Sequence, residues 1–100
     1  MKHAILAAAL ILAAASTTQA ADPANGKMIY DMNCVVCHGV GGHPVLPAAP
    51  SFAKGERLMQ PDTMLIESIE NGKNVMPAFL GILRRQEIRD VIAYLRTLHR

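Results

Sequence analysis

The chain has 100 residues, of which 51% are hydrophobic and 18% are charged. Ten Lys or Arg against eight Asp or Glu give a net charge of +2, which excludes the strongly basic surface expected of a nucleic-acid-binding protein. A chain of this length forms one small domain, near the size below which a hydrophobic core alone is marginal and a further stabilising group is expected.

The first twenty residues have the pattern of a secretory signal. Residues 1–3 carry positive charge, residues 4–15 are all apolar, and small residues favour cleavage after Ala20. Twelve apolar residues are too few for a bilayer span, which needs about 20. We therefore expect export to the periplasm, removal of residues 1–20 and a mature domain of residues 21–100 without stable membrane insertion. The alternative is an uncleaved anchor or a buried helix.

The first helix of the mature domain is expected from Pro23 to about Asn33. Asp22 is a good N-cap, and the missing N–H of Pro23 is harmless at the first helical position. Residues 39–50 contain three glycines and three prolines, which indicate a loop rather than a regular element.

Two further helices are expected in the second half of the chain. One spans residues 61–71 and ends before Gly72, since glycine readily adopts the conformation that closes a helix. Residues 73–80 are irregular. From about Arg84 to Leu98 apolar residues recur at three- and four-residue steps, as in an amphipathic helix. No segment alternates as a strand would, so the expected fold is all-α.

Residues 34–38 read Cys-Val-Val-Cys-His, which is the pattern of covalent c-type haem attachment. Cys34 and Cys37 can each add across one haem vinyl group, and His38 is then held against the iron as the proximal axial ligand. The alternatives are a disulfide, a thioredoxin-like redox pair and a structural zinc site. The redox pair would need a βαβ context, and the zinc site would need four ligands. We expect one covalent haem c per chain, which would also stabilise a small domain.

The second axial ligand is expected to be a methionine, because a neutral thioether favours ferrous iron. The mature domain has five: Met28, Met32, Met59, Met64 and Met76. The three in the predicted helices are interpreted as core residues. Met76 is favoured as the distal ligand because it lies in a loop, and because Pro77 restricts it to an extended conformation. Met59 is the alternative, as is an open or His-ligated site.

The remaining ring nitrogen of His38 is expected to donate a hydrogen bond to a backbone carbonyl, which would fix the ring. Pro47 and Pro50 both offer such a carbonyl. His43 and His99 are interpreted as surface residues outside the site.

Three segments of the chain resemble the small monohaem class I cytochromes c of bacteria, and the resemblance extends over residues 23–98. They are the haem motif, the run Asn-Gly-Lys-Asn-Val-Met-Pro-Ala-Phe at residues 71–79, and Ile-Arg-Asp-Val-Ile-Ala-Tyr-Leu-Arg at residues 88–96. The resemblance implies that the first and last helices cross, with Gly26 and Tyr30 of the first against Val91 and Tyr94 of the last. It also implies that Pro50, rather than Pro47, is the carbonyl partner of the proximal ligand.

Arg84 and Arg85 depart from the family pattern, in which the last helix commonly begins with a Ser, Thr or Asp cap and acidic residues. Basic residues at a helix start oppose its dipole, at about 0.3–1 kcal/mol each. Either the helix begins earlier, with Leu83 already helical, or the charges serve a partner.

The function implied by the resemblance is a periplasmic single-electron carrier and not an enzyme. Six-coordinate iron exchanges electrons without binding a substrate. The expected partners are a donor and an acceptor redox protein that dock transiently near the exposed haem edge. One alternative is a haem subunit bound permanently to a specific periplasmic dehydrogenase or oxidase. Another is a ligand-binding haem sensor or a peroxidase-like enzyme.

Overall fold

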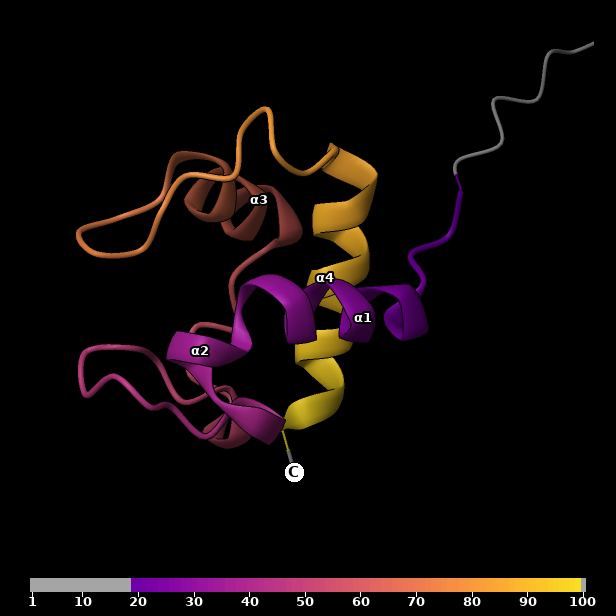
Figure 1. The fold of residues 1–100 in the computed structure, drawn as a ribbon. Helices are drawn as coiled ribbons and strands as arrows, with labels where there is room; N and C mark the ends of the chain where they lie inside the picture. Colours follow the sequence, from indigo (N-terminus) through magenta and orange to yellow (C-terminus); the bar gives the residue numbers. More distant parts are fainter. Residues whose placement is uncertain (1–18, 100) are drawn as a thin grey trace, which may run out of the picture.

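The computed structural model describes residues 19–99. In this range the chain forms helices and no strand, which confirms the expected all-α fold (Figure 1). The α-helices are α1 (Pro23–Asn33), α2 (Val35–His38), α3 (Asp62–Asn71) and α4 (Arg85–Leu98), and the short 3₁₀ helices are η1 (Val40–Gly42) and η2 (Phe52–Lys54). The three long helices lie where the sequence predicts them. The predicted signal segment lies almost wholly outside the described residues, so its cleavage stays a prediction.

Helices α1 and α4 cross and form the main contact of the fold (Figure 1). At the crossing, a Cβ on Gly26 would lie 1.9 Å from the backbone oxygen of Asp90, so only glycine allows this approach. One turn further along α1, the ring of Tyr30 packs against Tyr94, with centroids 5.2 Å apart. The helix crossing implied by the family resemblance is therefore confirmed.

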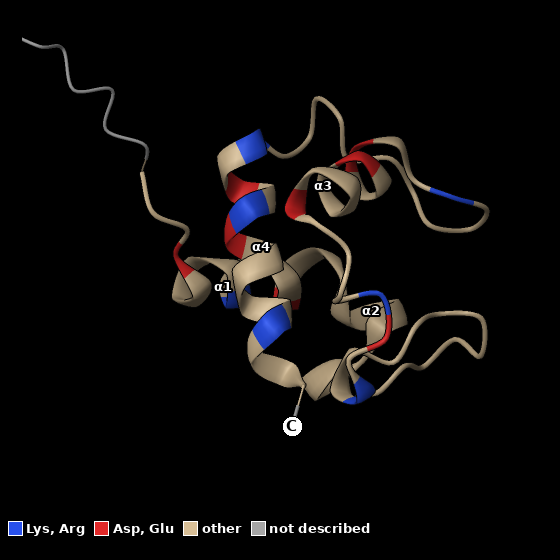
Figure 2. Cartoon of the chain, turned by 180° about the vertical axis from the view of Figure 1, so that it is seen from behind, with Lys and Arg blue, Asp and Glu red and all other residues tan. Residues whose placement is uncertain are grey.

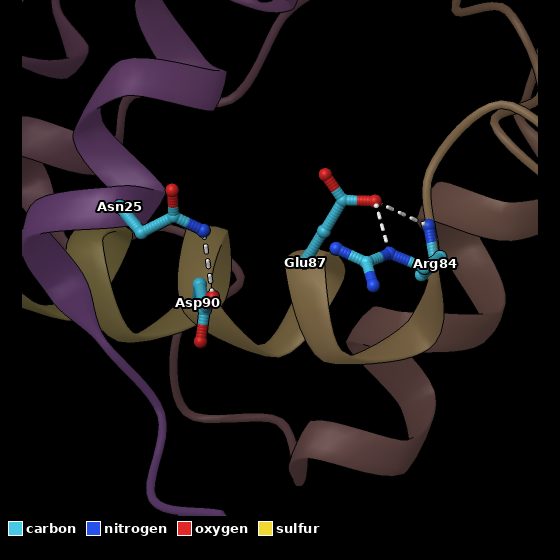
Figure 3. Close-up of polar contacts among 4 residues, drawn as sticks. All are labelled: Asn25, Arg84, Glu87 and Asp90. Atoms are coloured by element: carbon cyan, nitrogen blue, oxygen red, sulfur yellow. Dashed lines mark hydrogen bonds and ion pairs between the residues drawn. The ribbon is translucent and has the colours of Figure 1, made fainter.

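The start of α4 resolves the apparent conflict between Arg84 and the helix dipole. Arg84 is the N-cap, and the carboxylate of Glu87 accepts hydrogen bonds from its backbone N–H at 2.9 Å and its Nε at 3.2 Å (Figure 3). Arg85 donates to a carboxylate oxygen of Glu70 at 3.1 Å. The helix thus begins at Arg85 and not earlier at Leu83, and carboxylates partner both arginines.

The core consists of two hydrophobic clusters. The first contains Ile29, Tyr30, Phe52, Leu58, Val91 and Leu95, and the second contains Leu65, Ile66, Ile88 and Ile92. Helix α4 contributes to both clusters, and Leu83 packs against both of them.

Three methionines that were interpreted as core residues lie on the surface instead. The exposed fractions are 65% for Met28, 81% for Met32 and 51% for Met64. Met28 and Met32 are four residues apart and share a face of α1, while the same helix buries Ile29 and Tyr30. The interpretation was wrong because each helix buries only one stripe, and an apolar residue outside it stays exposed.

Candidate haem site

The two cysteines are placed by the junction of α1 and α2. Cys34 is the C-cap of α1 and the N-cap of α2. Its backbone oxygen accepts hydrogen bonds from the N–H groups of Cys37 and His38, at 3.2 and 2.9 Å. This single helical turn sets Cys34 and Cys37 three residues apart, on one face. Both thiols are free and half-buried, and both line the same pocket. The chain thus presents two thiols to one cavity, as double thioether formation requires.

Cys34 does not have the lowered pKa of a redox-active thiol. Burial, and then the neighbouring Cys37, raises the pKa of Cys34 to about 11. Thiol–disulfide chemistry needs a thiolate, which a lowered pKa supplies. The structure therefore gives no support to the thioredoxin-like alternative.

The imidazole of His38 enters the pocket from the end of α2. Its ring stacks on the ring of Phe52, with centroids 4.8 Å apart and an interplanar angle of 23°. Burial lowers the pKa of His38, which favours the neutral imidazole. The neutral ring is the form that ligates a metal.

The Nδ1 atom of His38 is the one buried side-chain nitrogen or oxygen within residues 19–99 that has no hydrogen-bond partner. The hydrogen bond expected between His38 and the carbonyl of Pro50 is therefore not formed in this structure. Pro50 does line the same pocket, whereas Pro47 does not. The role of Pro50 stays a prediction.

The loop after α3 brings Met76 to the pocket. Gly72 ends α3 with φ 67°, and a Cβ there would lie 2.5 Å from the backbone oxygen of Met76. Lys73 and Met76 then exchange two backbone hydrogen bonds, at 3.1 and 2.9 Å, so the segment is a tight turn. Met76 is half-buried and lines the pocket. Met59 is 96% exposed and does not line it.

The pocket that joins these residues has a volume of about 340 Å³, within the range of small-molecule and cofactor sites. Its walls are largely apolar: Phe52, Val91 and Leu95 come from the first core cluster and Leu65 from the second, and Phe79 also lines the pocket. Two free thiols, a neutral imidazole and a thioether in an apolar cavity fit a covalently attached haem. Arg57, Gln60 and Lys73 also line the pocket, and none of them was expected from the sequence to have a role in the site. Lys73 lies in the run of residues 71–79 that carries the family resemblance, whereas no motif marks Arg57 or Gln60.

His43 and His99, interpreted as surface residues, are exposed, and neither lines this pocket. Within residues 19–99 no helix is long and apolar enough to cross a membrane.

Comparison with known proteins agrees with this site. A family model described as cytochrome c oxidase, cbb3-type, subunit III matches residues 21–95. Cytochrome c6 of Thermosynechococcus vestitus is 39% identical over 93 residues, which cover 89% of this chain and 81% of that protein. The crystal structure of cytochrome c6 from the diatom Phaeodactylum tricornutum superimposes with a TM-score of 0.64 at 33% identity, covering 76% of this chain and 92% of that one. The c-type cytochrome KustC0563 gives a TM-score of 0.68 at 28% identity, with 75% and 98% covered.

A helical fold built around a Cys-x-x-Cys-His pocket, together with these relatives, defines a c-type cytochrome. The chain belongs to the small monohaem class I cytochromes c. It carries one covalently bound haem c with its iron, and it is an electron-transfer protein rather than an enzyme.

Proposed function

We propose that this protein shuttles single electrons between redox proteins of the periplasm, with haem iron held by His38 and Met76 and the porphyrin attached through Cys34 and Cys37. The proposal depends mainly on one observation: these four residues, from the junction of α1 and α2, from α2 itself and from the loop after α3, all line one apolar pocket. The exposure of Met59 supports the choice of Met76.

Haem c supplies a centre that gains or loses one electron. The chain determines how that centre behaves. His38 and Met76 as the two axial ligands would leave no position for a substrate or for oxygen, which suits a carrier. The Met76 thioether would favour the ferrous state. The apolar side chains of the walls would exclude water and limit the reorganisation that accompanies electron exchange.

The ligand assignment is tested by Met76→Ala, with Met59→Ala as the matched control. Met76→Ala should abolish the charge-transfer absorption between methionine sulfur and ferric iron, lower the reduction potential, and allow cyanide to bind. Met59→Ala should leave all three unchanged, since its side chain lies outside the pocket. The reverse pattern would show that Met59 is the ligand, and cyanide binding by the unaltered protein would favour the sensor alternative.

The attachment residues are tested by extraction of the denatured protein with acidified acetone. The unaltered protein should retain its haem, and Cys34→Ser or Cys37→Ser should keep at most one thioether, seen as a shift of the pyridine haemochrome spectrum. Haem that extracts freely from the unaltered protein would contradict attachment through these cysteines.

The periplasmic location rests on the signal-like pattern of residues 1–20. The full chain should appear in the periplasmic fraction with an N-terminus at Ala21, whereas a variant without residues 2–20 should stay in the cytoplasm without attached haem. Retention of residues 1–20 in the exported protein would favour the uncleaved anchor.

The description of the matching family model as an oxidase subunit favours one second candidate, a haem subunit bound to a larger oxidase. A free carrier should elute as a monomer from native extracts and reduce or oxidise several redox proteins. Constant co-elution with one large enzyme would favour the subunit.

A further inference from the structure

Four basic residues of the described chain have no carboxylate partner. Within residues 19–99, the basic residues that form ion pairs are Lys27, Arg84, Arg85 and Arg96. The basic residues that remain in this range are Lys54, Arg57, Lys73 and Arg89, for which no side-chain hydrogen bond is formed either. Of these four, Arg57 and Lys73 line the haem pocket, whereas Lys54 and Arg89 do not. Two cations that form no ion pair within residues 19–99 thus line one cavity.

Arg57 is held in an uncommon backbone conformation. Its φ of 69° lies in the left-handed region, which disfavours residues with a side chain. The surrounding loop is well braced: the N–H of Ser51 donates to Glu56 at 2.6 Å, and the Arg96 guanidinium donates to the carbonyls of Leu58 and Gln60. Such a conformation persists only where the neighbouring structure maintains it, and it is commonest at functional sites.

Lys73 reaches the pocket from a separate element. It begins the tight turn after α3 whose backbone pairs with Met76, and the following residue, Asn74, also has a positive φ of 55°. The segment between η2 and α3 and the loop after α3 each carry a basic residue (Figure 2). The two cations therefore come from independent loops that converge on the same cavity.

The chemistry of haem says which part of the cofactor needs these cations. The two vinyl groups, which Cys34 and Cys37 would take, lie on one side of the porphyrin, and two propionates lie on the other. The segment between η2 and α3, which carries Arg57, lies behind α2 in Figure 1 and in front of it in the reverse view. Carboxylates next to an apolar cavity require charged or polar partners.

We propose that Arg57 and Lys73 bind the haem propionates and neutralise their charge. The proposal rests on the covalent haem c of the family and not on the identity of the distal ligand. It explains why an arginine occupies this strained backbone position. A glycine there would relieve the strain but would remove the cation.

The test compares Arg57→Gln and Lys73→Gln with Lys54→Gln, which removes the same charge from an unpaired lysine outside the pocket. Proton NMR of the ferric protein reports the propionate methylene groups directly, and a redox titration reports the haem. Arg57→Gln and Lys73→Gln should each shift the propionate resonances and lower the reduction potential, because a nearby cation disfavours the ferric state. Arg57→Lys should restore most of both signals. Lys54→Gln should change them less.

The proposal would be overturned if the propionate resonances and the reduction potential shifted no more in Arg57→Gln and Lys73→Gln than in Lys54→Gln. The methionine charge-transfer absorption should persist in all of these variants, so a failure here is distinguishable from a wrong assignment of Met76. Should Arg57→Gln not fold, Lys73→Gln and Arg57→Lys decide the question by the same two measurements.

Discussion

Asp90 is a buried carboxylate that joins α4 to the start of α1. It accepts hydrogen bonds from the backbone N–H of Asp22 at 2.8 Å, from the Asn25 amide at 2.9 Å and from the Gln86 amide at 3.2 Å; Figure 3 shows the contact with Asn25. Burial acts to raise the pKa of Asp90, but these donors together lower it below its usual value. The ionised form therefore stabilises the folded state.

Asp90→Asn should reduce the free energy of unfolding by about 1–3 kcal/mol at neutral pH, because it weakens a buried acceptor of three hydrogen bonds. Since the folded-state pKa is lowered, the contribution of the carboxylate is present above its unfolded pKa and is lost as the pH falls through the folded value. The difference between the two proteins should thus shrink in strong acid. Denaturant unfolding at the two pH values measures it.

The control for this prediction is Asp31→Asn, which removes the exposed carboxylate that pairs with Lys27. Exposed pairs within one helix contribute little, so this change should leave stability nearly unaltered. A loss equal to that of Asp90→Asn would show that general charge, and not the buried hydrogen bonds, is responsible.

At the scale of the elements, the crossing of α1 and α4 depends on the absence of a side chain at residue 26. Gly26→Ala would gain up to about 1 kcal/mol in helix propensity. A methyl group 1.9 Å from a backbone oxygen must nevertheless push the helices apart. Overpacking of this kind costs typically about 1–3 kcal/mol, and a backbone neighbour cannot rotate away.

We therefore expect Gly26→Ala to lower the thermal midpoint of the haem-containing protein, as measured by circular dichroism. Lys27→Ala, one residue further on the exposed side of α1, should leave the midpoint unchanged within error. A midpoint for Gly26→Ala equal to or above that of the unaltered protein would mean that the helices cross elsewhere.

At the scale of the whole molecule, the two core clusters are joined mainly through α4 and Leu83, and the haem pocket takes part of its wall from each of them. A domain of this size buries a smaller fraction of its surface than a larger domain does, so its stability is close to marginal without a further stabilising group. Haem in this pocket would connect the clusters into one core.

A haem-free chain, made as the Cys34→Ser, Cys37→Ser double variant, should therefore lack a cooperative unfolding transition. Its helix content by far-ultraviolet circular dichroism should fall well below that of the haem-containing protein. Met76→Ala retains the cysteines and should remain folded, which separates loss of haem from loss of an axial ligand. A cooperative transition at a similar temperature in the double variant would show that the protein core is sufficient.

The sequence by itself determined the features that depend on residues close along the chain. Asp22 and Pro23 predict the start of α1 because capping is local, Gly72 predicts the end of α3, and residues 34–38 predict haem attachment because the two thiols and the imidazole need a fixed spacing. What the sequence could not determine are contacts between distant segments.

The sequence favoured Met76 over Met59 from its loop position and the proline that follows it, and the tertiary structure showed that Met76 lines the pocket while Met59 is exposed outside it. It also decided that Glu87 and Glu70 partner the arginines at the start of α4, and that Arg57 and Lys73 converge without partners at one cavity. The physical reason is that burial and charge pairing depend on how separate elements pack against one another, and no local period in the chain records that packing.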